Sequence, residues 1–142
     1  IEVENQRGLY KDSTYDLYRA NVNRIVDEFK QFTTHYKSKG YKLIGYGAAA
    51  KGMTFLNFSD VNLDIIIDDN ELKHNLYTPG KNTLIKPNGF LKQYKEDDKI
   101  LFIPLAWNFY DEIRSRILKT RNNDNDCFLS YFPTVRVTKW VT

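Results

Sequence analysis

Cysteine is nearly absent from this chain of 142 residues, and histidine is almost as scarce. The single cysteine, Cys127, excludes an internal disulfide and fits a reducing, cytoplasmic setting. One cysteine and two histidines are too few for the usual structural zinc site, so we predict no metal centre.

Long apolar runs and long runs of one charge are missing as well. No apolar segment approaches the roughly 20 residues needed to cross a bilayer, and the polar N-terminal stretch does not have the form of a signal peptide. The 21 basic and 18 acidic residues are interspersed and give a net charge of +3. Nucleic-acid binding calls for a clustered basic face, so we expect neither a membrane nor a nucleic-acid partner.

What the chain does contain suits one compact core. Hydrophobic residues make up 42% and aromatic residues 15% of the sequence, and this length accommodates one domain. The chain begins with Ile1 in place of Met, so we expect it to be part of a longer protein.

Predicted strands alternate with predicted helices along the chain. This order is typical of an α/β domain with a mostly parallel sheet and helices on both faces. We predict a connecting arm over residues 1–14 and a single Rossmann-like, three-layer domain over residues 15–142. The sequence pattern predicts helices over residues 15–38, 49–58, 88–94 and 107–120. The Asn- and Asp-rich composition of residues 121–126 predicts a solvated polar loop. Strand character marks residues 42–46, 63–67, 84–85, 99–105, 127–132 and 135–140.

The first predicted helix is long and amphipathic. Its apolar residues recur at three- and four-residue spacing, at Tyr18, Val22, Ile25, Phe29, Phe32 and Tyr36. The stripe favours a helix that covers the sheet over one that forms a coiled coil with a partner.

The stretch from Lys42 to Gly52 has the form of a strand, a tight glycine turn and a helix N-terminus. Such a junction directs backbone N–H groups and the helix dipole at one spot, where a phosphate is the natural occupant. Lys51 adds a positive charge there. The next predicted strand ends in Asp68, where a carboxylate can meet ribose hydroxyls, although Asp68 can equally serve as a turn residue.

The turn does not match the standard phosphate-binding fingerprints fully. Lys51 precedes Gly52 with no Ser or Thr directly after, unlike a P-loop. The dinucleotide pattern places Ala50 at its third glycine position. Trp107 and Asn108, just after a buried strand, could stack and hydrogen-bond a base or sugar, while a core role for Trp107 is equally compatible with the sequence.

Four motifs in a fixed order make a more specific pattern. They are Gly45–Gly52 with Leu56-Asn57, Asp68-Asp-Asn70 with Lys73, Tyr77-Thr-Pro-Gly80, and Ala106–Phe109 with Asp111-Glu-Ile113. Together they resemble the C-terminal domain of the S-adenosylmethionine-dependent sugar C-methyltransferases, over residues 15–137.

The resemblance implies that this domain binds the acceptor, a dTDP- or UDP-linked sugar, for deoxysugar biosynthesis. S-adenosylmethionine would be held by an upstream domain, so this segment needs no cofactor and would not catalyse methyl transfer alone. The residues that the resemblance places at the nucleotide sugar are Gly45, Tyr46, Gly47, Ala48, Ala49, Lys51, Gly52, Asn57, Asp68, Asn70, Trp107 and Asn108.

One departure concerns the catalytic base. The family carries a His-Gly-Gly-Ser-x-Arg segment just upstream, whereas residues 5–11 here contain no histidine. The base then lies elsewhere, the parent enzyme methylates O or N, or the domain retains binding alone. Two other readings stay open: a fragment of an NAD-dependent oxidoreductase, with Asp68 on the ribose, and a non-catalytic interaction module.

Overall fold

The computed structural model describes residues 1–139, and Trp140, the end of the last predicted strand, lies outside the described residues. The helices are α1 (Glu2–Gln6), α2 (Asp12–Ser38), α3 (Ala50–Ser59) and α4 (Tyr110–Thr120), with 3₁₀ segments η1 (Glu71–Lys73), η2 (Asn88–Gln93) and η3 (Trp107–Phe109). The strands are β1 (Lys42–Tyr46), β2 (Ile65–Ile67), β3 (Ile85–Lys86), β4 (Ile100–Pro104), β5 (Cys127–Ser130) and β6 (Arg136–Lys139).

The six strands form one sheet in the order β3-β2-β1-β4-β5-β6. All neighbouring strands are parallel except β5 and β6, which pair antiparallel. The chain starts at β1, moves outward through β2 and β3, and then returns to place β4 on the other side of β1. The strand order therefore reverses between β1 and β4, and ligands of open α/β sheets bind at such reversal points.

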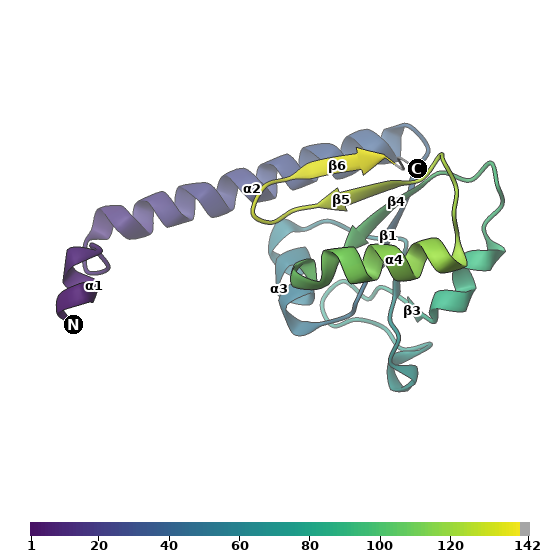
Figure 1. Ribbon diagram of the computed structural model, residues 1–142, viewed down its shortest axis with the longest axis horizontal. Helices are drawn as coiled ribbons and strands as arrows, with labels where there is room; N and C mark the ends of the chain where they lie inside the picture. The colour runs from purple at the N-terminus through teal and green to yellow at the C-terminus, as the bar shows by residue number, and fades with distance from the viewer. Residues whose placement is uncertain (140–142) are drawn as a thin grey trace.

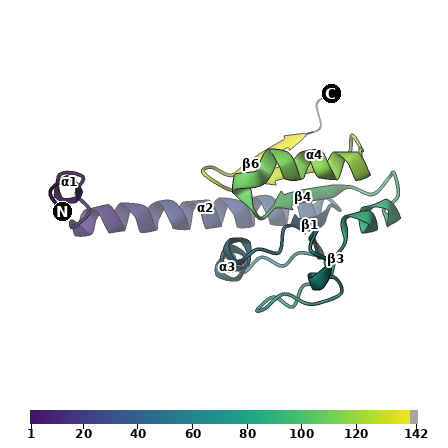
Figure 2. The same ribbon diagram turned by 60° about the horizontal axis from the view of Figure 1, so that its bottom comes forward.

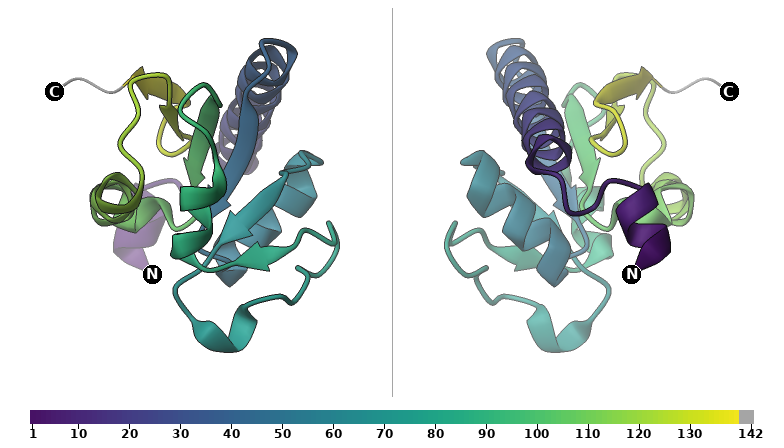
Figure 3. Two further views of the ribbon diagram at one scale, coloured as in Figure 1. Left: turned by 90° about the vertical axis from the view of Figure 1, so that its right-hand side faces the viewer. Right: turned by 90° about the vertical axis from the view of Figure 1, so that its left-hand side faces the viewer.

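Helices cover both faces of the sheet, as the sequence predicts. Figure 3 shows α4 on one side of the strands and α2 with α3 on the other. Phe29 of α2 and Leu56 of α3 belong to the core on the face covered by these two helices. Ile113 and Ile117 of α4 belong to the core on the opposite face. All five residues of β4 are buried, which confirms the continuous apolar run as a strand with both faces covered.

The N-terminal half of α2 extends beyond the sheet (Figure 1). Its 27 residues span about 40 Å, whereas the longest strands have five residues and span about 17 Å. Only Val26, Phe29 and Thr33 of α2 are buried, and Tyr18 on the predicted apolar stripe is 70% exposed. The sheet-covering role of the helix holds for its C-terminal half.

Several predicted element ends differ from the structure. The arm contains the helix α1, and α2 begins at Asp12, three residues before the predicted start. Figure 2 shows α1 at the N-terminal end of α2, away from the sheet. The hydroxyl of Thr14 donates to the carbonyl of Gly8 at 2.7 Å and fastens the arm to the helix. Residues 107–109 form a 3₁₀ turn that precedes α4 and does not belong to it.

The polar loop 121–126 is solvated at its centre, where Asn122, Asp124 and Asn125 are exposed as its composition predicts, but not at its ends. Both ends are buried, and the guanidinium of Arg121 binds the carboxylate of Asp126, with Nε to Oδ2 at 2.7 Å. Composition indicates a solvated loop here because four Asn and Asp residues separate this pair, and nothing local shows that its ends turn inward.

Candidate functional site

The glycine turn joins β1 to α3 at the carboxyl edge of the sheet, beside the point of strand reversal. Gly47 has a φ of +90°, a backbone conformation that disfavours any residue with a Cβ. A Cβ on Gly52 would lie 2.6 Å from the Cβ of Leu105, so this glycine lets α3 approach the end of β4. Gly45 is likewise a close-packing position, between Leu63 and Leu105.

The N–H groups of the turn itself are bonded within the protein. Gly47 donates to the carbonyl of Ile67 at 2.7 Å, and Ala49 donates to the carbonyl of Gly47 at 2.8 Å. Ala48 donates to Oδ2 of Asp68 at 2.7 Å. These three groups hold the shape of the turn and are not offered to a ligand.

Asp68 organises this turn. Besides Ala48, its carboxylate accepts the N–H of Asn70 at 2.9 Å and the ammonium of Lys73 at 3.1 Å. Lys73 also donates to the carbonyl of Ala48 at 3.0 Å, so the peptide groups on both sides of Ala48 are fixed. Asp68 is 7% exposed, and both of its carboxylate oxygens have hydrogen-bond partners. Asp68 therefore acts as a turn residue, the alternative that the sequence left open.

The first turn of α3, unlike the glycine turn, has backbone N–H groups that are not bonded to any described residue of the protein. The helix begins after Ala49, which supplies no side-chain cap, and the first turn contains no acidic residue. The first helical bond runs from the N–H of Met53 to the carbonyl of Ala49. Within residues 1–139, the N–H groups of Ala50, Lys51 and Gly52 have no hydrogen-bond partner, and this end of the helix carries the positive end of its dipole.

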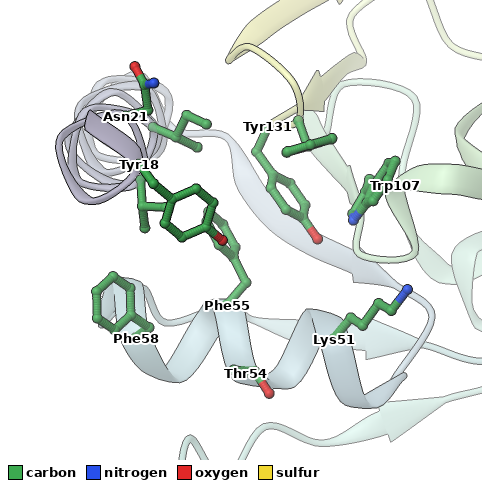
Figure 4. Close-up of a pocket in the computed structure, with 11 residues that line it drawn as sticks. Tyr18, Asn21, Lys51, Thr54, Phe55, Phe58, Trp107 and Tyr131 are labelled. Atoms are coloured by element: carbon green, nitrogen blue, oxygen red, sulfur yellow. The ribbon is translucent and has the colours of Figure 1, made fainter. Parts of the chain in front are cut away.

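Lys51 stands on that same turn. Its side chain is exposed and forms no ion pair with any described residue. Figure 4 shows its ammonium pointing toward the indole of Trp107, which follows β4. Three free N–H groups beside an unpaired ammonium form a suitable environment for an anion.

Two cavities flank this point. One, which we call the aromatic groove, has a volume of about 350 Å³ and lies between α2, α3 and the segment after β5; Lys51 and Trp107 line one part of it (Figure 4). The other, the reversal-point crevice, has a volume of about 290 Å³ and lies between the ends of β1 and β2 and the helix α4. The first turn of α3 therefore adjoins the aromatic groove through Lys51.

A chain of polar groups crosses the reversal-point crevice. The hydroxyl of Tyr46 donates to Asp69 Oδ1 at 2.7 Å, and Arg116 Nη1 donates to Asp69 Oδ2 at 2.5 Å. Burial raises the pKa of the Tyr46 phenol, and the bond to Asp69 raises it further. The bond to the same carboxylate also raises the pKa of the Arg116 guanidinium.

The remaining predicted residues are dispersed. Asn57 donates to the carbonyl of Pro79 at 3.4 Å and packs against Gly80, where it anchors the loop between β2 and β3. Asn70 accepts the N–H of Leu72 and so caps η1. Asn108 is exposed beside Trp107. The structure thus brings Gly47, Ala48 and Asp68 together, places Lys51 and Trp107 at the aromatic groove, and places Asn57 elsewhere.

Sequence reasoning missed Arg116 and all the aromatic residues of the groove except Trp107. Arg116 lies 47 positions from Asp69 in the chain, and no spacing rule connects two such residues. The adjacency of Asp69 to Asp68 was the one available signal. Tyr18 lies on the apolar stripe that predicts a sheet-covering helix, and no motif singles out the tyrosine and phenylalanine residues of α3 and of the segment after β5.

Comparison with known proteins gives one result. No curated protein matches the chain. Residues 1–133 match the family model described as the C-methyltransferase C-terminal domain, a match that includes the arm and every strand of the sheet up to β5. No helix within residues 1–139 combines the length and apolar character that a membrane span requires. Because the model covers nearly the whole chain, the protein belongs to the C-methyltransferase C-terminal domain family.

Proposed function

We propose that this domain binds the diphosphate of a nucleotide-linked sugar, the methyl acceptor, at the first turn of α3. The observation that carries the proposal is the free N-terminal turn of α3, with its three unbonded N–H groups and the unpaired ammonium of Lys51. A doubly charged diphosphate fits this combination of donors and charge. Membership of a methyltransferase family supports the assignment of the ligand as a substrate of methyl transfer.

The glycine turn contributes rigidity to this site. Asp68 and Lys73 fix the peptide groups around Ala48, and Ala49 follows directly as the residue before α3. The first turn of the helix is therefore held in position before a ligand arrives, which lowers the entropic cost of binding.

S-adenosylmethionine would be supplied by another domain of the parent methyltransferase. The free donors of α3 form one anion site on the described residues, and this site accounts for the acceptor. In this proposal the chain binds and orients the nucleotide sugar, and the methyl donor and the base that activates the acceptor lie outside it.

The oxidoreductase reading loses its main support. It assigns the ribose of NAD to Asp68, but both oxygens of that carboxylate already accept protein donors. A ribose there would have to displace Ala48 or Lys73.

Amide NMR of the ¹⁵N-labelled chain tests the proposal. Titration to millimolar pyrophosphate, UDP and dTDP should shift the amides of Ala50, Lys51 and Gly52, because these N–H groups would donate to the phosphate oxygens. Lys51→Gln should weaken binding of all three ligands several-fold. Lys92→Gln is the matched control, since Lys92 is an exposed lysine on η2, which leads to the amino end of β4. Unchanged α3 amides at millimolar ligand would overturn the proposal.

A further inference from the structure

The aromatic groove is built mainly from rings. Its volume of about 350 Å³ falls within the range of small-molecule sites. The rings that line it are Tyr18, Phe55, Phe58, Trp107, Tyr131 and Phe132. Phe55 and Tyr131 stack nearly parallel, at 10° and 4.1 Å between ring centres, and give the groove a firm inner wall.

Tyr131 is fixed in place, while the outer rings are free. Its hydroxyl donates to the carbonyl of Leu105 at 2.6 Å, and the residue is only 4% exposed. By contrast Tyr18 of α2 is 70% exposed and Phe58 of α3 is 59% exposed. Figure 4 shows Tyr18 extending from α2 across the space toward α3. These two exposed rings line the same groove as the firm wall of Phe55 and Tyr131, so the groove offers accessible ring faces to a flat, apolar-faced group.

One end of the groove is polar. The ammonium of Lys51 and the indole of Trp107 lie there (Figure 4). The indole N–H of Trp107 has no hydrogen-bond partner within the described part of the chain. The groove thus offers ring faces along its length and an unpaired cation with a free donor at one end.

We infer that the aromatic groove holds the nucleoside part of the bound nucleotide, with the base stacked on the exposed rings of Tyr18 and Phe58. This inference rests on the proposed function, which places the diphosphate at Lys51. From Lys51 the nucleoside extends along the groove, because the aromatic rings line the rest of the groove beyond the ammonium. A base has an apolar face that every aromatic side chain can stack.

The charge distribution favours a nucleotide over a protein partner in this groove. An apolar protein surface packed over it would bury the ammonium of Lys51 and the indole N–H without partners, at a considerable desolvation cost. A nucleoside diphosphate satisfies both ends at once, with its base on the rings and its phosphate on the lysine.

Binding of three probes to the full chain separates the two parts of the inference. Pyrophosphate reports the anion site alone, the nucleoside uridine reports the groove alone, and UDP reports both. The double variant Tyr18→Ala/Phe58→Ala should bind UDP about tenfold more weakly and leave pyrophosphate affinity unchanged. Tyr15→Ala is the control on α2, because Tyr15 is exposed but lies outside the groove.

A second control tests the competing cavity. Phe109 is 51% exposed and lines the reversal-point crevice, so Phe109→Ala should leave UDP affinity unchanged. A loss with Phe109→Ala and none with the double variant would place the base in that crevice and overturn the inference. In that case pyrophosphate would still bind, and the proposed function would stand. If pyrophosphate and UDP both fail to bind, the proposed function fails and the inference with it.

Saturation-transfer NMR on the unsubstituted chain gives an independent measurement. The base and anomeric protons of UDP should receive more saturation than the ribose H5′ protons, because the base contacts the rings while the phosphate end meets a lysine. Equal or reversed saturation would contradict the stacking of the base.

Discussion

Asp68 accepts the backbone N–H of Ala48 at 2.7 Å, across 20 positions of the chain. The same oxygen accepts the ammonium of Lys73, which also donates to the carbonyl of Ala48. The end of β2 therefore fixes the turn that leads out of β1, directly before the first turn of α3. Through this relationship a buried acid at the end of β2 positions the segment that leads into the first turn of α3, where we propose the anion site.

Replacing Asp68 with alanine should destabilise the domain. The N–H groups of Ala48 and Asn70 would lose a buried acceptor in two partly buried hydrogen bonds, at a cost of about 2–3 kcal/mol in the free energy of unfolding. Urea denaturation measures the difference. Asp97→Ala, in an exposed loop, is the control and should change the free energy by less than about 0.5 kcal/mol. A comparable loss in both variants would show that Asp68 does not have this role.

The glycines of the turn should differ from one another in their tolerance of a methyl group. Gly47→Ala forces a residue with a Cβ to adopt a φ of +90° and should cost about 1–2 kcal/mol. Gly52→Ala places its Cβ 2.6 Å from that of Leu105 and should cost about 1–3 kcal/mol.

Gly89→Ala is the matched control for both. Gly89 has no atom within 4 Å of an added Cβ and no positive φ, so its substitution should leave the melting temperature nearly unchanged. Thermal unfolding of the three variants ranks them directly. A loss at Gly89 as large as that at Gly52 would contradict the close-packing explanation.

Stability should fall at alkaline pH, in part through Tyr41. Burial, and then the nearby Cys127 thiol, raise the pKa of Tyr41 to about 12, whereas an unfolded tyrosine titrates at about 10. The stabilising contribution is fully present below pH 10 and is lost as pH rises toward 12, because the unfolded state releases its proton first.

Tyr41→Phe should therefore make the free energy of unfolding fall less steeply between pH 9 and pH 11. The measurement is urea denaturation at several pH values in this range. Tyr15→Phe, on the exposed part of α2, should keep the slope of the unsubstituted chain. Identical slopes in all three proteins would exclude a raised pKa for Tyr41.

Much of the fold could be predicted from local pattern. The continuous apolar run of β4 and the three- and four-residue apolar spacing of α2 are signals that lie within a few residues, so they can be read directly. The overhang of α2 could not be predicted, because it depends on the length of strands that pack against only part of the helix. The antiparallel direction of β6 also depends on a neighbour, β5, and not on the residues of β6 themselves.

The candidate site likewise combines features that are local in the sequence with features that depend on tertiary contacts. The junction of Gly47, Lys51 and the start of α3 is local and was predicted. Whether its N–H groups are free is not local: Asp68 and Ile67, on the next strand, occupy those of Gly47 and Ala48 and leave those of α3. The sequence assigns the donors of an anion site to the glycine turn, whereas the structure, over residues 1–139, leaves unbonded N–H groups only in the first turn of α3 among the residues of this junction.

Arg121 joins the loop before β4 to the loop before β5, at the edge of the sheet opposite the candidate site. It is 8% exposed, binds Asp126 through Nε at 2.7 Å, and donates to the carbonyls of Tyr94, Lys95 and Asp98 at 2.9–3.1 Å. Arg121→Met leaves Asp126 as an unpaired buried charge and should lower the free energy of unfolding by about 3–5 kcal/mol. Arg121→Lys keeps the charge but lacks the planar fork of donors, so it should recover only part of this loss. Lys119→Met, at an exposed position of α4, serves as the control in urea denaturation. If Arg121→Met and Lys119→Met unfold at the same urea concentration, the buried pair contributes nothing, and the loop before β4 is held by its backbone alone.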